Sequence, residues 1–320
     1  MTKSPEQAIS VVTPPVLVPS VHEDPMGQFL AGQLTERTKK AYYADLCEFF
    51  NGDRITPDDV RAITFTDIID YRNALAAMGR KRTTINRKLS SLKAFFRMMV
   101  ATDIINKNPA DSALVRGYRV DDEISGKSLP RNVLRMILDA AGEELDELRR
   151  DRDLAILHLL TFAGLRRSEV ANMSWSDIAQ DGAFWILRLP NTKSGVAQDV
   201  KLQTIVIHYL HTYQDTLRRH GYAVDRVFLS LSRNQSHGKP ITDQSINQIV
   251  RRYARIAGVT RNVTAHMFRH TCCTMSIEGG AKPQQVQAHL RHKDLKTTMR
   301  YYENRERLTD NASDYIHISG

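Results

Sequence analysis

Apolar residues recur at helical spacing through the N-terminal third of the chain. Between residues 27 and 110, one such run follows Thr38, a second begins near Phe65 and a third begins near Ile85. A spacing of three to four residues places apolar side chains on one face of a helix, which can then pack against its neighbours. We expect Thr38 to cap the first helix and Asn108-Pro109 to end the series. This region predicts a small, all-helical domain.

The pattern becomes mixed beyond residue 129. Helical spacing returns in two apolar runs, around Val133 to Leu138 and around Leu154 to Leu160. Short runs at 184–187 and 199–202 have the composition of strands, and the Pro-Asn-Thr-Lys-Ser-Gly segment between them predicts a hairpin turn. Further helices are expected at about 203–219 and 242–257. The fold class is therefore mainly α with a small antiparallel β-sheet.

Composition divides the chain further. Residues 1–25 carry five of the eleven prolines and no helical periodicity, which predicts a disordered tail. Asp, Ser, Gly and charged residues with little periodicity predict a linker. The expected division is a tail at 1–25, a helical domain at 26–112, a linker at 113–128, an α+β domain at 129–308 and a C-terminal tail at 309–320.

Charge favours a polyanionic partner. Lys and Arg number 45 against 36 Asp and Glu, which gives a net charge of +9 and a pI near 9.5. Basic proteins gain affinity for nucleic acid because neutralised phosphates release counterions. Cys47, Cys272 and Cys273 are too few and too badly spaced for a disulfide framework or a zinc site. With no long apolar stretch and no signal peptide, we expect a cytoplasmic protein that contacts no membrane.

Two helical segments carry candidate DNA contacts. Five of nine residues at 80–88 are basic, which predicts a helix laid against phosphates, although such a run is also typical of a solvated face. The helix at 242–257 carries amides and arginines that can reach base edges or phosphates. The candidates are Arg80, Lys81, Arg82, Arg87 and Lys88 in the first segment, and Gln244, Asn247, Gln248, Arg251 and Arg252 in the second, with Arg255 beyond them.

Arg166 follows a buried helix and stands at the head of the next one. A guanidinium there keeps its charge and can bind two phosphate oxygens, or it can pair with Glu169 as a helix cap. Farther along, His266 and Arg269 are three residues apart, so one helical face presents both. His270 is expected to point elsewhere. The His-Glu-x-x-His pattern is missing and no carboxylate lies on that face, so a metal site is a poor interpretation.

Lys193 lies in the expected hairpin turn, where it is either a proton donor to a leaving oxygen or an ordinary solvated lysine. His292 and Tyr301 flank a helix expected to start near Asp294. A basic pocket that ends in a tyrosine suits metal-free attack on a phosphodiester, with the tyrosine as nucleophile. The neighbouring Tyr302 is a competing candidate for that role.

These residues follow the order and spacing of a known family. Gly164-Leu165-Arg166-Arg167-Ser168-Glu169 resembles the Gly-Leu-Arg-x-Ser-Glu pattern of the tyrosine recombinases, the family of phage integrases, Cre and the Xer proteins. Lys193 matches the hairpin lysine, and His266 with Arg269 matches the His-x-Leu-Arg-His box. His292 matches the Leu-Gly-His box, and Tyr301 follows it by nine residues, as the nucleophile does in the family. The resemblance covers 129–308 throughout, with weaker similarity at 27–110 to the core-binding domain.

The resemblance implies a C-shaped clamp of two domains around duplex DNA. Tyr301 would form a 3′-phosphotyrosine link while the two arginines stabilise the phosphorus, and Glu169 would be the acidic partner of Arg166. Lys193 would protonate the leaving 5′-oxygen, His266 would assist proton transfer from the tyrosine, and His292 would bind the phosphate. The family needs no cofactor and no metal. Its members act as homotetramers on inverted-repeat DNA core sites and pass through a Holliday junction, so a nucleoid-associated protein, such as one of a mobile element, is expected.

Two positions depart from the pattern. Phe268 replaces a leucine, and Arg291 replaces the glycine of Leu-Gly-His, which predicts a strained backbone at Arg291 if that turn needs unusual angles. The 25-residue proline-rich start is too short for an extra folded domain, which favours a two-domain Xer-like or transposon-resolvase-like member. We expect the C-terminal tail to dock into a neighbouring protomer.

Three other classes of protein remain as alternatives, of which a metal-dependent nuclease would need clustered carboxylates that the sequence does not place near these motifs. A type IB topoisomerase uses the same chemistry, and a catalytically silent DNA-binding relative would keep the fold but lose some of the six residues. The sequence names no accessory protein and no target site.

Overall fold

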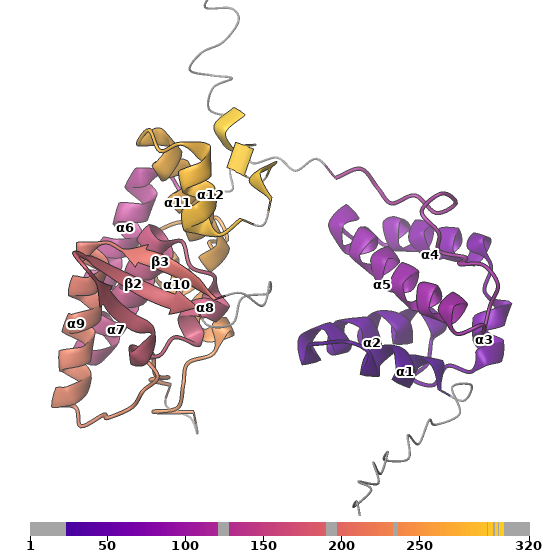
Figure 1. Cartoon of the computed structure of the whole chain (residues 1–320), viewed down its shortest axis with the longest axis horizontal. Helices are drawn as coiled ribbons and strands as arrows, with labels where there is room; N and C mark the ends of the chain where they lie inside the picture. The colour runs from indigo at the N-terminus through magenta and orange to yellow at the C-terminus, as the bar shows by residue number, and fades with distance from the viewer. Residues whose placement is uncertain are drawn as a thin grey trace, which may run out of the picture. The chain divides into compact units, whose positions relative to one another are not determined.

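The computed structural model describes residues 24–120, 128–189, 197–232, 236–292, 294–296, 298–299 and 301–303. The chain forms two compact units, Met1–Asp122 and Glu123–Gly320 (Figure 1). Asp24 caps the first helix, which begins at Pro25, so the last residue of the expected N-terminal tail is helical. The rest of that tail, and the expected C-terminal tail at 309–320, lie outside the described residues.

The first unit is entirely helical in its described part. Its helices are α1 (Pro25–Ala31), α2 (Glu36–Phe50), α3 (Pro57–Ala62), α4 (Phe65–Ala77) and α5 (Arg82–Ala101). Threonines begin three of them, because each threonine side chain accepts a hydrogen bond from an otherwise unpaired amide of the first turn. Thr56 and Thr64 do this for α3 and α4 within capping boxes. The cap of α2 is Thr35 and not Thr38 as expected; the Thr38 amide donates to the Thr35 hydroxyl at 3.1 Å.

Aromatic side chains fill the centre of the first unit. Phe95 and Phe96 of α5 are fully buried, and their rings meet each other edge to face with centroids 5.3 Å apart. Phe29 of α1 and Phe49 of α2 contact this pair edge to face. Edge-to-face contacts add to the stability that the buried apolar area supplies. The long helix α5 is therefore the element around which the others pack.

Part of the segment expected to be a linker, residues 113–128, belongs to the first unit instead. Val115 is fully buried in the core of the first unit, and the Tyr118 amide donates to the Asn86 side chain of α5 at 2.8 Å. Two kinds of contact make this segment part of the first unit. Val115 buries apolar surface in the core, and the Asn86 side chain pairs with backbone groups of the segment. Residues 121–127 lie outside the described part of the chain.

The second unit combines helices with a small sheet. Its elements are α6 (Arg131–Gly142), α7 (Glu147–His158), the π-helix η1 (Leu159–Ala163), α8 (Arg167–Ala171), η2 (Trp175–Asp177), β1 (Ile178–Asp181), β2 (Phe184–Leu189), β3 (Gln198–Leu202), α9 (Thr204–Arg219), α10 (Asp243–Ile256), α11 (Ala265–Glu278) and α12 (Pro283–Leu290). The mainly helical fold with a small antiparallel sheet confirms the fold class expected from sequence.

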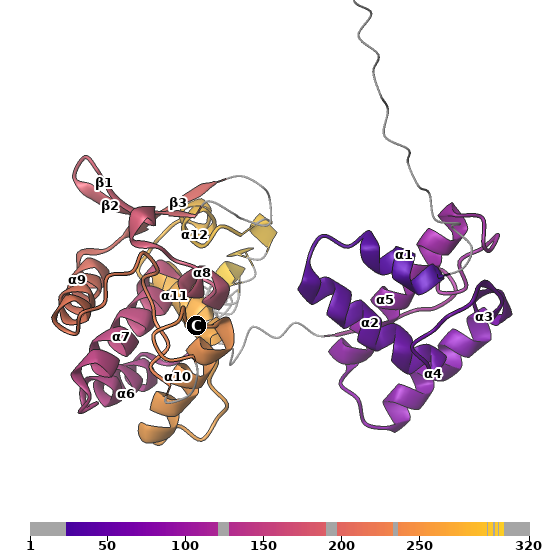
Figure 2. The same ribbon diagram turned by 90° about the horizontal axis from the view of Figure 1, so that it is seen from below.

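The sheet has the order β1-β2-β3 and is antiparallel throughout. Ile186 of β2 pairs with Ala179 on one side and with Lys201 on the other. Strands β2 and β3 were expected, whereas β1 was not. Figures 1 and 2 show the sheet lying along one side of the helices.

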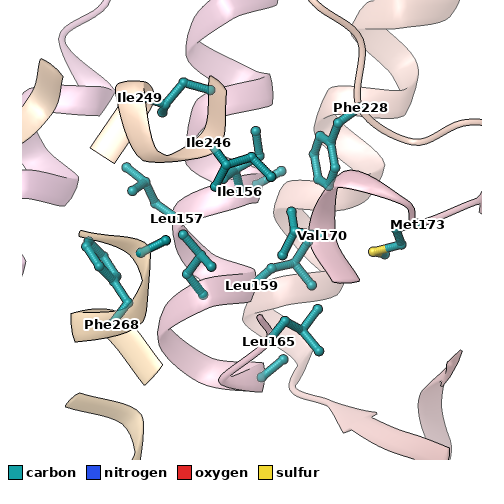
Figure 3. Close-up of a cluster of buried hydrophobic side chains, with 14 of the residues drawn as sticks. Ile156, Leu157, Leu159, Leu165, Val170, Met173, Phe228, Ile246, Ile249 and Phe268 are labelled. Atoms are coloured by element: carbon teal, nitrogen blue, oxygen red, sulfur yellow. The ribbon is translucent and has the colours of Figure 1, made fainter. Parts of the chain in front are cut away.

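The core of the second unit forms around α7 and η1. Ile156, Leu157 and Leu159 are fully buried there and pack with Phe268 of α11, Ile246 of α10 and other side chains from α8 (Figure 3). Burial of this apolar surface fixes where α8 and α11 begin relative to η1. These two helices carry Arg166, His266 and Arg269, so the core decides how these side chains are placed.

Candidate active site

Arg166 stands at the head of α8, as the sequence predicted. Gly164 ends η1 in the left-handed conformation (φ 55°), Leu165 is buried, and Arg166 becomes the residue that precedes α8. The Arg166 amide donates to Glu169 at 2.7 Å, and its guanidinium donates to the other Glu169 oxygen at 2.7 Å. The structure shows the pairing with Glu169, and 43% of the Arg166 side chain stays exposed, so the expected contact with phosphate stays a prediction.

Gly164 is required by packing as well as by backbone angle. A Cβ atom at this position would overlap the side chain of Leu290 and press on the sulfur of Cys272 at 3.2 Å. Only glycine adopts positive φ without a steric penalty. The glycine of the Arg166 motif therefore allows η1, α11 and α12 to approach closely.

Arg269 is buried and bonded to backbone on both sides. Only 4% of the residue is exposed. One guanidinium nitrogen donates to the Gly164 carbonyl at 2.5 Å, and the other donates to the Leu290 carbonyl. Burial, reinforced by the nearby charges of Arg166 and Arg291, lowers the pKa of Arg269 to about 10, so it stays protonated at neutral pH. Arg269 thus links the end of η1 to the end of α12.

His270 lies in the site, contrary to the expectation that it points elsewhere. Its Nδ1 hydrogen-bonds with the hydroxyl of Tyr301, and its ring meets that of His266 edge to face with centroids 4.4 Å apart. His266 and His270 are four residues apart on α11 and so share a helical face. That spacing was the signal that could have identified His270 from the sequence.

Tyr301 is buried among apolar residues of the second unit. It is 7% exposed and packs in a cluster with Cys272, Ile277, Val286 and Leu290, against which Tyr302 is only partly buried. Its hydroxyl hydrogen-bonds with Nδ1 of His270. The two tyrosines therefore have different surroundings, and Tyr301 is the one bonded to a histidine of α11.

His292 is held neutral by its surroundings. Burial, followed by the charges of Arg269, Arg166 and Arg291, lowers its pKa to about 4. Its Nδ1 hydrogen-bonds with the Thr298 hydroxyl at 2.8 Å. Asp294 accepts from the Lys296 amide at 2.9 Å, in keeping with a helix that starts near Asp294. A neutral imidazole can serve a phosphate as a hydrogen-bond donor without adding charge.

The strain expected at Arg291 is confirmed. Arg291 ends α12 in the left-handed conformation with φ 56° and ψ 46°. Its guanidinium donates to Glu169 at 2.7 Å. Three arginines, Arg166, Arg269 and Arg291, thus approach one carboxylate.

Lys193 lies outside the described residues.

One of the basic residues expected to contact DNA in the first unit faces inward, and its neighbour is paired with a buried carboxylate. Lys88 is 7% exposed and donates to Glu48 at 2.7 Å and to Asp45 at 3.2 Å. Arg87 forms a two-point pair with Asp45 and keeps half of its side chain exposed. Burial raises the pKa of Asp45, but the hydrogen bonds from Arg87, Ser91 and Lys88 outweigh it and hold the pKa below its usual value. Lys88 is therefore a structural residue, which corrects the expectation.

The beginning of the basic segment has the exposure that DNA contact requires. Arg80, Lys81 and Arg82 are all exposed at the start of α5. Arg82 donates to the Arg119 carbonyl at a long 3.4 Å. These three side chains remain candidates for phosphate contact.

In α10 the candidate readers also divide into two groups. Gln244, Gln248, Arg251 and Arg255 are exposed. The Asn247 side chain accepts from the Ala265 amide at 2.9 Å, and Arg252 pairs with Glu144. Asn247 therefore satisfies an amide in the first turn of α11, and the expectation that it reads bases is revised.

Within the described ranges, His, Cys, Asp and Glu form no group of three or more that could hold a metal ion. None of the helices described in the structure is long and apolar enough to cross a bilayer.

Comparisons with known proteins agree with this geometry. The phage integrase family matches residues 127–307, and its N-terminal SAM-like domain matches residues 29–102. A tyrosine recombinase of Agathobacter rectalis is 28% identical over 276 residues, which cover 84% of this chain and 86% of that protein.

Solved structures share the fold at low identity. The XerH site-specific recombinase bound to a palindromic difH substrate, in a post-cleavage complex, has a TM-score of 0.68 at 19% identity and covers 86% of this chain and 79% of its own. The lambda integrase tetramer bound to a Holliday junction has a TM-score of 0.65 at 19% identity, and the match covers 87% of this chain and 74% of the integrase chain. Since the family match spans more than half of the chain, this protein belongs to the phage integrase family of tyrosine recombinases.

Proposed function

We propose that this protein cuts and rejoins duplex DNA at a specific site through a covalent 3′-phosphotyrosine intermediate formed by Tyr301. The observation that carries the proposal is the contact between the Tyr301 hydroxyl and His270, the residue next to Arg269. It brings the only tyrosine with the family spacing into contact with the helix that carries His266 and Arg269.

Arg166 and Arg269 stabilise the charge that develops on the phosphorus. Fixed donors aimed at that charge act without reorganising during the reaction. Arg166 is exposed enough to meet the phosphate, and its partner Glu169 fixes its direction. Arg269 is protonated and lies close enough to lower the pKa of His292. We therefore expect the charge of Arg269 to act on the phosphate that His292 binds.

Histidines move the proton of the nucleophile. In the tautomer with an unprotonated Nδ1, His270 accepts the hydrogen bond from Tyr301 and can receive its proton as the phosphoester bond forms. His266 lies edge to face with His270 and assists that transfer. His292, neutral at physiological pH, binds a phosphate oxygen as a donor.

Lys193 gives a proton to the departing 5′-oxygen. When Tyr301 attacks, the new tyrosine–phosphorus bond replaces the broken phosphorus–oxygen bond, so the energy needed for rejoining is retained in the covalent link. The reverse attack by a 5′-hydroxyl then releases the tyrosine. Neither ATP nor a metal ion is needed for this cycle.

The substrate is a duplex core site made of inverted repeats, bound by a homotetramer that exchanges strands through a Holliday junction. Support comes from the likeness to the DNA-bound XerH and lambda integrase structures described above. Arg80, Lys81 and Arg82 supply phosphate contacts from the first unit. Gln244, Gln248 and Arg251 supply contacts from α10 in the second.

A cleavage assay tests the proposal. A binding site is first selected from a pool of random duplexes, and a nicked version is incubated with the protein in EDTA. The native protein and Tyr302→Phe should give a protein–DNA adduct that survives detergent, whereas Tyr301→Phe should bind the duplex and give none. An adduct from Tyr301→Phe, or its loss only in Tyr302→Phe, would reject the assignment of the nucleophile.

A further inference from the structure

Arg291 turns its charged side chain into the protein at a position where the backbone favours glycine. It ends α12 with φ 56°, and only 3% of its side chain is exposed. Its guanidinium donates to the His289 carbonyl at 3.0 Å and to Glu169 at 2.7 Å, while its buried Nε has no hydrogen-bond partner in the described structure. A left-handed non-glycine residue and a buried guanidinium are both unfavourable unless another interaction compensates.

Glu169 is that compensating partner, and Arg291 shares it with Arg166. One Glu169 oxygen accepts from the Arg166 guanidinium at 2.7 Å. The other accepts from the Arg166 amide and from Arg291, each at 2.7 Å. The carboxylate is therefore held on both oxygens, by α8 on one side and by the end of α12 on the other.

We propose that Arg291 is a positioning residue of the catalytic site, which holds Glu169 ionised and fixed so that Glu169 in turn fixes the guanidinium of Arg166. The role in catalysis rests on the proposed strand-transfer function, whereas the role in positioning does not. Arg291 acts through Glu169, and no contact between Arg291 and the phosphate is required.

The charges around Glu169 agree with this role. Burial raises the pKa of Glu169, but Arg291 and then the hydrogen bonds and charge of Arg166 outweigh it, so the pKa lies below its usual value. Burial contributes most to lowering the pKa of Arg291, and the charge of Arg166 adds to it, while the charge of Arg291 helps to lower the pKa of Arg269.

The titratable groups on the neighbouring elements give the expected direction of change. His292 and His289 on α12 lie within the field of these arginines, as does the buried thiol of Cys272, and His266 on α11 acts on His292. Removing Arg291 takes away a positive charge from Glu169 and from His292. The pKa of both groups should then rise, so that protonation of either group disturbs the site at a higher pH than in the native protein.

The first test uses the full chain without DNA. The carboxyl carbon of Glu169 and the Nε–H of Arg166 are followed by NMR across pH in the native protein, in Arg291→Met and in Arg291→Gly. Both variants should show a higher pKa for Glu169, and the Arg166 signal should move to that of a solvated guanidinium. Arg131→Met is the matched control, since it removes an exposed guanidinium paired with Glu278 at 3.1 Å, between α6 and α11.

The glycine variant guards against misfolding, because glycine suits the left-handed backbone and removes only the side chain. Arg291→Lys, which keeps the charge but loses the planar fork, should lie between the native protein and Arg291→Met. An unchanged pKa of Glu169 together with an unchanged Arg166 signal in folded Arg291→Gly would overturn the proposal.

The second test measures the rate of adduct formation on the nicked duplex against pH. Arg291→Met and Arg291→Gly should be slower by about 10- to 100-fold at neutral pH, as for misplaced catalytic groups, and their acid-side loss should begin at a higher pH. Native rate and pH profile in both variants would remove Arg291 from the catalytic site. If the native protein itself forms no adduct, the proposed function fails, while the NMR titration still decides whether Arg291 positions Glu169 and Arg166.

Discussion

At the scale of single residues, the site depends on close approach as much as on charge. Gly164 lets the chain leave η1 with positive φ while Leu290 and Cys272 occupy the space that a Cβ atom would need. Its carbonyl also accepts from Arg269 at 2.5 Å. A change at this glycine therefore moves a backbone atom to which the buried Arg269 is bonded.

Gly164→Ala should lower the free energy of unfolding of the second unit by roughly 2–4 kcal/mol, from positive φ and overlap together. Urea denaturation followed by tryptophan fluorescence measures this, because Trp175 and Trp185 both lie in this unit. Gly182→Ala is the matched control: it has φ 57° but no heavy atom within 4 Å, so only the backbone cost of about 1–2 kcal/mol should remain. Equal losses in the two variants would argue against close packing at Gly164.

Single residues also show where sequence reasoning ends. The spacing of His266, Arg269, His292 and Tyr301 was readable because catalytic chemistry restricts both residue type and order. His270 was assigned elsewhere because it follows Arg269 directly, although its four-residue separation from His266 places it on the same face. The ion pair between Arg291 and Glu169 joins residues 122 positions apart, which no local pattern encodes.

At the scale of elements, α10 supports α11 as well as offering a surface to DNA. Asn247 accepts from the Ala265 amide at 2.9 Å, one residue before His266. The first amides of a helix have no partner within the helix and depend on such acceptors. Asn247 therefore helps to place the histidine that begins the catalytic face of α11.

Asn247→Ala should lower the free energy of unfolding by about 1 kcal/mol and slow adduct formation. Its affinity for the selected duplex and for random duplexes should change by the same factor. Gln248→Ala, one residue on and exposed, should keep stability and change sequence preference instead. Fluorescence anisotropy on both duplexes and thermal unfolding separate the two roles. A loss of preference in Asn247→Ala at native stability would restore it as a base reader.

The basic segment that opens α5 has a similar division of roles. Lys88→Met should lower the stability of the first unit by on the order of 2 kcal/mol, since a buried charged donor to Asp45 and Glu48 is lost. Arg80→Ala should leave stability unchanged and reduce the salt dependence of DNA binding by about one phosphate contact. Chemical denaturation and binding at several salt concentrations measure these effects. If Lys88→Met reduced the salt dependence of binding and left stability unchanged, Lys88 would turn outward on DNA.

Elements differ in how readable they were from sequence. The apolar runs of β2 and β3 flank a turn segment, and the buried apolar residues of α5 recur at helical spacing from Ile85 to Met99, so these elements were predicted. Helices α1 and α3 are seven and six residues long, too short to show periodicity. Strand β1 has no buried residue, so it lacks the alternation that marks a half-buried strand. Its position depends on pairing with β2, which is a tertiary contact.

At the scale of the whole molecule, assembly is expected to need the chain beyond Tyr301. Residues after Leu308 include Tyr315, Ile316 and Ile318, a small apolar set. A chain that ends at Leu308 should bind a single half-site nearly as the full chain does, but lose cooperative binding to a complete site, because head-to-tail exchange of such segments links four subunits. Mobility-shift titrations on half and full sites measure this. A truncated chain that assembles and recombines at the native rate would leave the segment without such a role.

The two backbone bonds of Arg269 have a consequence for how relatives of this protein are interpreted. Because its guanidinium is linked to the carbonyls of Gly164 and Leu290, this side chain is needed for two segments of the fold to meet, whether or not DNA is ever cut. A descendant that had given up catalysis would still have a structural reason to retain it. The presence of this arginine in a related chain is therefore weak evidence of activity. The exposed Arg166 and the hydroxyl of Tyr301 are more informative about whether such a chain still cuts DNA.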